Sequence, residues 1–264
     1  MLKVQNLVKV FNKGSVNEKM ALDNVSFHLR KGEFVTIIGS NGAGKSSFLN
    51  AIAGNFPTDS GNVVIGDRDV TNFPQHKRAK FISRVYQDPM SGTAASMTIE
   101  ENLVMALRRG EKRRLKLAIK NKDREYFREE LKKLDLGLEN RLTTKVSLLS
   151  GGQRQALTLL MATFKEPEVL LLDEHTAALD PKTAAKVLDL TCDVTKESNL
   201  TTMMITHNLD QALNVGDRTI MMHDGRIILD IEGDKRKQVT IADLLLMFEN
   251  ASGTQLHTDR MLFS

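Results

Sequence analysis

Hydrophobic and polar positions alternate over the first thirty residues of the chain. The segments LKVQNLVKV (2–10) and VSFHLR (25–30) place apolar and polar side chains on opposite sides, which is typical of half-buried strands. The polar segment NKGSVNEKM (12–20) separates them. We therefore predict two β-strands joined by a loop at the amino-terminal end.

Continuous apolar runs replace this alternation further along the chain. EFVTIIG (33–39), VLLLD (169–173) and TTMMITH (201–207) have the pattern of strands that are buried on both faces of a parallel sheet. Segments with apolar residues at helical spacing lie between them, namely 45–54, 150–164 and 182–196. The alternation of strand and helix predicts a doubly wound α/β core.

The remaining segments complete the predicted organisation. Residues 88–147 are polar with a helical pattern, so we expect a helical subdomain at about 88–160 inserted into one domain that spans 1–250. In segment 218–230, Asp224 and Gly225 predict a type I′ hairpin turn. Thr240 is a candidate N-cap for a closing helix, and the aperiodic tail 251–264 is expected to be flexible.

Composition and charge narrow the class of protein. The 264 residues contain no apolar run of about 18 residues, no signal-peptide pattern and one cysteine, so we expect a cytosolic location. The net charge of +4 is concentrated in segment 108–124, which holds nine basic and two acidic residues. This segment predicts either an anion-facing patch or a solvated helix face. Nucleic acid is not expected as a partner, because no aromatic residues interleave the basic run.

The most specific motif is GSNGAGKS (39–46), which matches G-x-x-x-x-G-K-[ST] after a predicted strand and before a predicted helix. The glycines let backbone N–H groups surround phosphates, and the helix N-terminus adds positive potential. The lysine can reach the β- and γ-phosphates, and the following hydroxyl can ligate Mg²⁺. We therefore expect ATP and Mg²⁺ to bind here. The candidate nucleotide-binding residues are Gly39, Ser40, Asn41, Gly42, Ala43, Gly44, Lys45, Ser46 and Ser47, with Ser46 also a metal ligand.

Two carboxylates follow the leucine run of LLLDEHTAALD (170–180). Asp173 ends a predicted strand, where P-loop proteins place a carboxylate near the metal. Glu174 comes next and could orient or deprotonate an attacking water. We expect His175 to take no direct part in the chemistry, because neighbouring strand residues point to opposite faces.

A second anion site is predicted at LSGGQ (149–153). Ser150 and Gln153 form a capping box ahead of an apolar helix, and Gly151 and Gly152 leave bare N–H groups at its start. Together with GSNGAGKS and VLLLDE, this motif resembles the signature of ATP-binding cassette (ABC) ATPases, and the resemblance covers nearly the whole chain.

The resemblance implies a P-loop NTPase core with a mainly parallel sheet, an N-terminal antiparallel β part and a helical insertion. It implies a magnesium- and water-sensing role for Gln87 in VYQDP, a D-loop position for Asp180, and a γ-phosphate contact for His207 in MITHN. Phe11 is in the position of an aromatic residue that stacks on adenine. Alternatively, Phe11 is simply the inward residue of an edge strand.

The resemblance also implies the partners. In this family two ATPase subunits form a head-to-tail homodimer or pseudo-dimer, in which Ser150, Gly151, Gly152 and Gln153 of one subunit close on ATP held by the other. The helical insertion faces transmembrane permease subunits, so the chain is expected to be peripheral on the inner face of the cell membrane. An extracytoplasmic solute-binding protein is expected in the same system.

These features predict the ATP-hydrolysing subunit of a transporter that takes up a small solute. LLLDEHTAALDP has His175 where proline is common, and it resembles a subgroup of bacterial uptake ATPases, some assigned to aromatic amino acids. One alternative is a soluble ABC ATPase of an assembly complex, such as iron–sulfur cluster assembly. Another is a non-enzymatic nucleotide-binding module. Chromosome-type members need a long coiled coil, for which 88–149 is too short.

Overall fold

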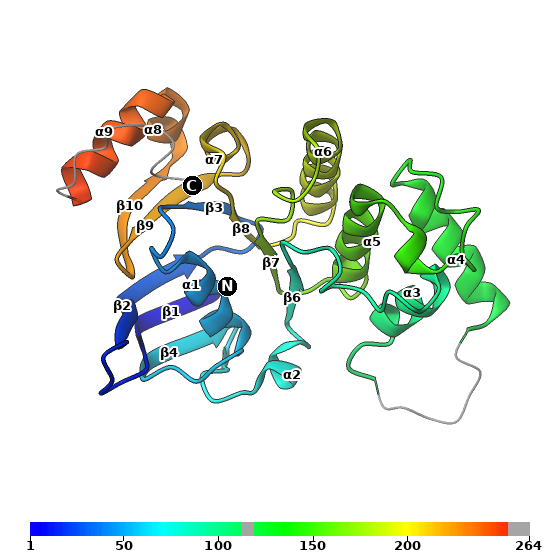
Figure 1. The fold of residues 1–264 in the computed structure, drawn as a ribbon, viewed down its shortest axis with the longest axis horizontal. Helices are drawn as coiled ribbons and strands as arrows, with labels where there is room; N and C mark the ends of the chain where they lie inside the picture. The colour runs from blue at the N-terminus through cyan, green and yellow to red at the C-terminus, as the bar shows by residue number, and fades with distance from the viewer. Residues whose placement is uncertain (112–118, 253–264) are drawn as a thin grey trace.

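The computed structural model describes residues 1–111 and 119–252, and its strands form two sheets (Figure 1). The first sheet is antiparallel and has the strand order β2-β1-β4-β5. Its strands are β1 (Leu2–Phe11), β2 (Lys19–Leu29), β4 (Ser60–Ile65) and β5 (Arg68–Asp69). The alternating burial of β1 and β2 confirms the two predicted N-terminal strands.

The second sheet forms the centre of the molecule and has the order β10-β9-β3-β8-β7-β6. All neighbouring strands are parallel except the β9–β10 hairpin. The strands are β3 (Phe34–Ile38), β6 (Ile82–Val85), β7 (Val169–Asp173), β8 (Thr202–Ile205), β9 (Arg218–His223) and β10 (Arg226–Glu232). Every residue of β3, β7 and β8 is buried, so the mainly parallel core that the apolar runs predicted is confirmed.

The helices fall into groups that Figure 1 separates clearly. One group lies to one side of both sheets and has a hydrophobic core of its own, built around buried Leu103, Phe127 and Leu157. Its helices are α3 (Ile99–Leu107), α4 (Asn121–Lys132) and α5 (Gly151–Thr163), with a short 3₁₀ turn at Val146–Leu148. The other helices are α1 (Lys45–Ala53), α2 (Gln75–Arg78), α6 (Pro181–Glu197), α7 (Leu209–Asn214), α8 (Gly233–Gln238) and α9 (Ile241–Ser252). None of the helices described is long and apolar enough to cross a bilayer.

The basic segment 108–124 is described only at its two ends, because 112–118 lie outside the described residues. At these ends the arginines make internal contacts. Arg108 pairs with Asp123, and Arg124 pairs with Glu100, which is almost fully buried. Arg109 donates a hydrogen bond to the Ser83 hydroxyl of β6. Arg108, Arg109 and Arg124 are therefore each ion-paired or hydrogen-bonded to another residue of the chain. The predicted flexible tail lies outside the described residues from 253 onward.

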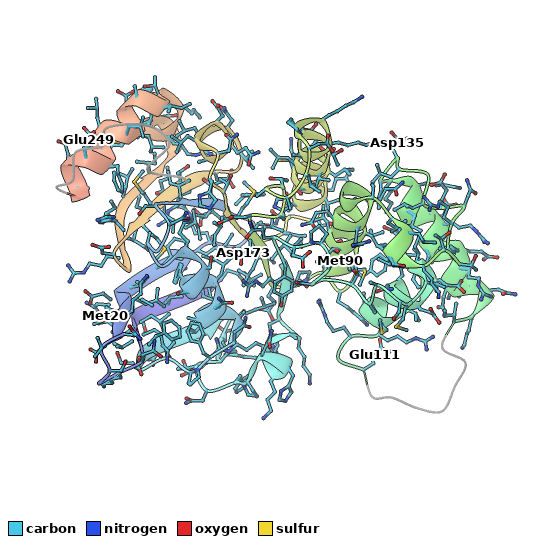
Figure 2. All side chains as sticks on the ribbon, viewed as in Figure 1. Met20, Met90, Glu111, Asp135, Asp173 and Glu249 are labelled. Carbon is cyan, nitrogen blue, oxygen red and sulfur yellow. The ribbon has the colours of Figure 1, made fainter. Side chains whose placement is uncertain are left out.

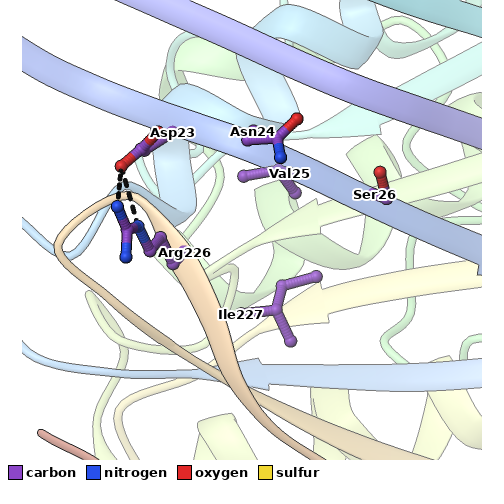
Figure 3. Close-up of a pocket in the computed structure, with 6 residues that line it drawn as sticks. All are labelled: Asp23, Asn24, Val25, Ser26, Arg226 and Ile227. Atoms are coloured by element: carbon purple, nitrogen blue, oxygen red, sulfur yellow. Dashed lines mark hydrogen bonds and ion pairs between the residues drawn. The ribbon is translucent and has the colours of Figure 1, made fainter.

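The predicted hairpin turn holds the two sheets together. Asp224 and Gly225 both have positive φ, 44° and 74°, which a type I′ turn requires. The Gly225 carbonyl accepts from Asp23 N, and its N–H donates to the Ala43 carbonyl. Arg226 pairs with Asp23 beside this turn, in a small pocket between β2 and β10 (Figure 3). The turn thus fixes the loop before α1 against both sheets.

The structure also contains elements that the hydrophobic pattern did not predict. Strands β4, β5 and β6 and the short helices α2, α7 and α8 carry no long apolar run. Strand β6 has four residues and an arginine, Arg84, in its middle. The predicted cap at the start of α9 is confirmed, since the Thr240 hydroxyl accepts from Asp243 N at 3.2 Å.

Candidate active site

The loop from β3 into α1 follows a path that side chains would block. Gly44 has a φ of 101°, and a Cβ placed on it would lie 2.6 Å from the Ala21 carbonyl oxygen. Gly39 has a φ of 145°, and its Cβ would lie 2.2 Å from the Met222 carbonyl oxygen. Only glycine fits this combination of positive φ and close backbone approach. The glycines therefore let the loop pack directly against the backbone of Ala21 and Met222.

Lys45, the first residue of α1, is buried and folds back onto the loop. Its ammonium donates to the carbonyls of Gly39 at 2.6 Å and Ser40 at 3.1 Å. Burial lowers the pKa of this ammonium, and the negative charges of Glu174 and Asp173 partly offset that effect. The side chain is thus held beside the two carboxylates, where an arriving phosphate could replace the carbonyls as its partner.

A pocket opens between this loop and the first sheet. It is lined by Phe11, Lys19, Ala21, the loop residues Asn41 to Ser47, and Glu174. Phe11 thus lines the same pocket as the loop, and its ring packs edge-on against Phe56 with centroids 5.1 Å apart. Lys19 matches no motif, and its place in the pocket depends on pairing with Phe11 across β1 and β2.

Glu174 and His207 lie at the carboxyl ends of the neighbouring parallel strands β7 and β8. His207 Nε2 is 2.6 Å from Glu174 Oε1, and both side chains are largely buried. Glu174 has a φ of 47°, an uncommon value for a residue with a side chain. This left-handed turn aims its carboxylate into the pocket.

Asp173 ends β7 near the centre of the molecule (Figure 2) and forms a buried ion pair with Arg84 of β6. The exposed fractions of the two side chains are only 12% and 9%. Asp173 was predictable from the leucine run before it, whereas Arg84 was not. A charged residue within a short strand has no recognisable pattern until its partner across the sheet is known.

The other predicted residues lie outside this pocket. Ser150 caps α5 through Gln153 N, with the reciprocal bond of a capping box, as predicted. A Cβ on Gly152 would lie 2.0 Å from Thr183 Cγ2, so α5 and α6 are in tight contact there. Asp180 caps α6 by accepting from Thr183 N at 3.1 Å. Gln87 is exposed in the loop after β6. One chain does not bring Ser150, Gly151, Gly152, Gln153, Asp180 or Gln87 into the lining of the P-loop pocket.

His175 is buried in the core rather than in the pocket. Its exposed fraction is 1%, and Nε2 lies 2.9 Å from the Thr191 hydroxyl of α6. Burial lowers its pKa to about 4, so the ring is neutral at physiological pH. The two side chains do lie in different places, but strand alternation, the predicted reason, is wrong. Strand β7 ends at Asp173, and Glu174 then adopts a left-handed conformation, so Glu174 and His175 are not neighbours on a strand. The histidine links the segment after β7 to α6.

This burial predicts an acid-dependent loss of stability. Above about pH 6.5 the ring is neutral in both the folded and unfolded states, so it adds no pH dependence. Below that pH the unfolded chain binds a proton that the folded chain excludes until about pH 4. The free energy of unfolding should then fall by about 1.4 kcal/mol per pH unit, to a total of about 3 kcal/mol.

The measurement is urea unfolding at pH 7 and pH 5 for the natural chain and for His175→Gln. Glutamine can keep a hydrogen bond to Thr191 but does not titrate, so the variant should lose most of this pH dependence. His28, whose pKa is also lowered, is present in both proteins and cancels. Equal pH dependence in the two proteins would contradict the assigned burial.

The fold and the site together define a P-loop ATPase, with a glycine-rich loop, a buried lysine and two consecutive carboxylates at the carboxyl end of the parallel strand β7. Within that class, the chain belongs to the ABC transporter family, whose model matches residues 22–177. It is the ATP-hydrolysing subunit of an importer-like ABC transporter, and it binds ATP. Membership of this family implies that the chain dimerises and works with permease subunits.

Two relatives indicate where in the family it falls. The chain is 44% identical over 251 residues to the tyrosine transport ATP-binding protein of Clostridioides difficile, a match that covers 95% of this chain and all of that one. It is 34% identical to the methionine import ATP-binding protein MetN of Geobacillus kaustophilus, over 86% of this chain and 64% of that protein. The relatives do not favour the alternative of a soluble assembly factor.

Solved structures of ABC cassettes share the fold. The dimeric post-hydrolysis state of the cassette MJ0796 bound to ADP and Pi has a TM-score of 0.75 and 29% identity, covering 88% of this chain and 98% of that one. The ADP conformation of the cassette MJ1267 has a TM-score of 0.77 and 28% identity, covering 96% and 97%. The expected P-loop NTPase core with its helical insertion is thereby confirmed.

Proposed function

We propose that this chain uses Mg²⁺-dependent ATP hydrolysis to drive uptake of an aromatic amino acid, tyrosine or a close analogue, through separate permease subunits. One observation carries the choice of solute: the 44% identity to a tyrosine transport ATP-binding protein extends over that protein's whole length. The relative named for methionine import shares less, at 34% identity. An amino acid is therefore the solute class, and an aromatic one is the first to test.

The residues at the site fit Mg²⁺. This ion prefers oxygen ligands and is commonly bound by one or two carboxylates together with substrate phosphates. Ser46 supplies an exposed hydroxyl in the pocket, and Asp173 supplies a carboxylate close enough to influence Lys45. Among the described residues, no group of three or more acidic, histidine or cysteine side chains is arranged to hold a metal ion, so the remaining ligands would be the phosphates. We propose Gln87, in the loop after β6, as a further ligand of this Mg²⁺ site.

The proposed roles follow from these positions. The amides of the loop 39–47 and Lys45 would hold the phosphates, and Phe11 would contact the base. Ser46 and Asp173 would hold Mg²⁺, which would supply positive charge to offset the charge that develops on the phosphate. Glu174 would position the attacking water and accept its proton, and His207, 2.6 Å away, would hold that carboxylate and reach the γ-phosphate.

The site is proposed to be completed by a second copy of the chain. The capping box at the start of α5 uses the N–H groups of Ser150 and Gln153 and leaves those of Gly151 and Gly152 for a ligand, but this helix N-terminus lies outside the P-loop pocket. A head-to-tail dimer would bring it onto the phosphates held by the partner, with Asp180 at the junction. The dimeric solved cassettes support this arrangement.

The remaining partners are proposed on the same basis. The helical group at about 88–160 would dock on the permease, which would hold the chain at the inner face of the cell membrane. A solute-binding protein outside the membrane would deliver the amino acid.

A strain that lacks the gene tests the transport role. Uptake of radiolabelled tyrosine at low concentration should fall to the background level and return with the natural gene, while Lys45→Ala should not restore it. Uptake of radiolabelled methionine serves as the control for the other named solute class. Loss of methionine uptake with normal tyrosine uptake would refute the proposed solute.

A further inference from the structure

Arg84 lies on the same face of the second sheet as Asp173. Strand β6 pairs in parallel with β7, and the register places Arg84 opposite Leu171. Because side chains two residues apart share a face, Asp173 and Arg84 project to the same side. Helix α1, which begins with Lys45 at the phosphate loop, covers this side of the sheet through Leu49 and Ile52.

The Arg84 guanidinium joins three parts of the nucleotide site. One terminal nitrogen holds Asp173 Oδ2. The other donates to Asn50 Oδ1 on α1 at 2.5 Å. The group also lies over the Tyr86 ring, 4.7 Å from its centroid, next to the loop that carries Gln87. One rigid fork therefore connects the phosphate-loop helix, the carboxylate strand and the strand that leads to Gln87.

The energetics favour a role beyond bracing the sheet. A buried ion pair gains little net stability, because both charges lose their hydration. Arg84 Nε is also buried without a hydrogen-bond partner among the described residues, which adds to that cost. An apolar side chain would fill the same space in a strand at a lower cost. The charge is therefore better explained by what it does to Asp173.

We infer that Arg84 is a positioning residue for the metal-side carboxylate. By holding Oδ2 of Asp173, it restrains the carboxylate, and Oδ1, which takes no part in this ion pair, would be the oxygen that serves the metal. Partners that orient metal ligands in this way commonly change metal affinity by about 10-fold to 100-fold when removed. This inference rests on the proposed Mg²⁺ site and adds a residue that sets its geometry.

The test measures metal binding without turnover. Mn²⁺ replaces Mg²⁺, and electron paramagnetic resonance follows free Mn²⁺ as it is titrated into the full-length protein with a non-hydrolysable ATP analogue. Arg84→Gln should raise the dissociation constant for Mn²⁺ about tenfold. The affinity for the same analogue in EDTA should change by less than about twofold, because Lys45 and the loop amides are untouched. Arg84→Lys keeps the charge but cannot hold Asn50 and Asp173 together. Its dissociation constant for Mn²⁺ should therefore lie between those of the natural chain and of Arg84→Gln.

Arg218→Gln is the matched control. Arg218 pairs with Glu33 and Asp230 and has an exposed fraction of 14%, but it lies at the start of β9, at the opposite end of the sheet from Asp173. It should lower thermal stability and leave Mn²⁺ affinity unchanged. An unchanged Mn²⁺ affinity in Arg84→Gln, or in Arg84→Lys if the first variant does not fold, would overturn the inference, as would an equal loss in Arg218→Gln. Failure of the natural chain to bind Mn²⁺ with the analogue would overturn the proposed metal site itself.

Discussion

Replacing Glu174 by glutamine should stop steady-state ATP hydrolysis while ATP still binds. The glutamine side chain has nearly the same shape and can keep a hydrogen bond to His207, but it cannot accept a proton from water. General-base contributions of this kind are typically about 10²-fold to 10⁴-fold in rate, so kcat should fall by at least about 100-fold. The ATP-bound chain should then accumulate as a dimer, measured by light scattering after size-exclusion chromatography.

Glu168→Gln is the matched control for this prediction. Glu168 lies just before the other end of β7 and pairs with Arg68 in a solvent-exposed contact. Its replacement should leave both turnover and oligomeric state unchanged. Normal turnover by Glu174→Gln would mean that another group activates the water. If the natural chain bound ATP but did not hydrolyse it, the chain would be a non-enzymatic nucleotide-binding module.

Replacing Lys45 by alanine should remove most of the nucleotide affinity. The Lys45 ammonium is buried, and its bonds to the Gly39 and Ser40 carbonyls keep it within the loop that we propose holds the phosphates. Charge-assisted hydrogen bonds contribute about 1.5–3 kcal/mol, so ATP affinity should fall by about 10-fold to 100-fold. Equilibrium binding of a fluorescent ATP analogue measures the change directly.

Lys132→Ala provides the comparison, since Lys132 makes only an exposed pair with Glu129 one helical turn away. Its loss should not affect binding. If Lys45→Ala bound the analogue as tightly as the natural chain, the phosphates would have to lie elsewhere than in the loop 39–47.

Local motifs predicted the glycine-rich loop between β3 and α1, because the residues that form it are contiguous in the chain. The turn from β3 into α1 needs glycine at Gly39 and Gly44, and the requirement is visible in GSNGAGKS itself. The capping box at Ser150 and the I′ turn at Asp224 are equally local. The buried strands β3, β7 and β8 were predictable because a two-sided hydrophobic environment leaves an uninterrupted apolar run.

Features that depend on pairing across the sheets were not predictable. Arg84 interrupts the apolar pattern of β6, and the reason for it is visible only when Asp173 of β7 lies beside it. Lys19 enters the pocket through its register with Phe11. A backbone conformation can be equally hard to predict. Glu174 has a left-handed conformation, which affects the direction of His175, and the residue type of Glu174 does not indicate that conformation. The signature residues near Ser150 remain predictions, because their proposed ligand site requires a second subunit.

The most direct test of the proposed transport function uses the chain together with the membrane proteins that co-purify with it, reconstituted in liposomes with ATP on the side of the ATPase. We predict that radiolabelled tyrosine crosses the membrane only with ATP and Mg²⁺, that tyrosine transport and ATP hydrolysis rise together, and that Glu174→Gln abolishes both. Tyrosine movement that is independent of ATP, or hydrolysis that proceeds without moving any amino acid, would contradict the account.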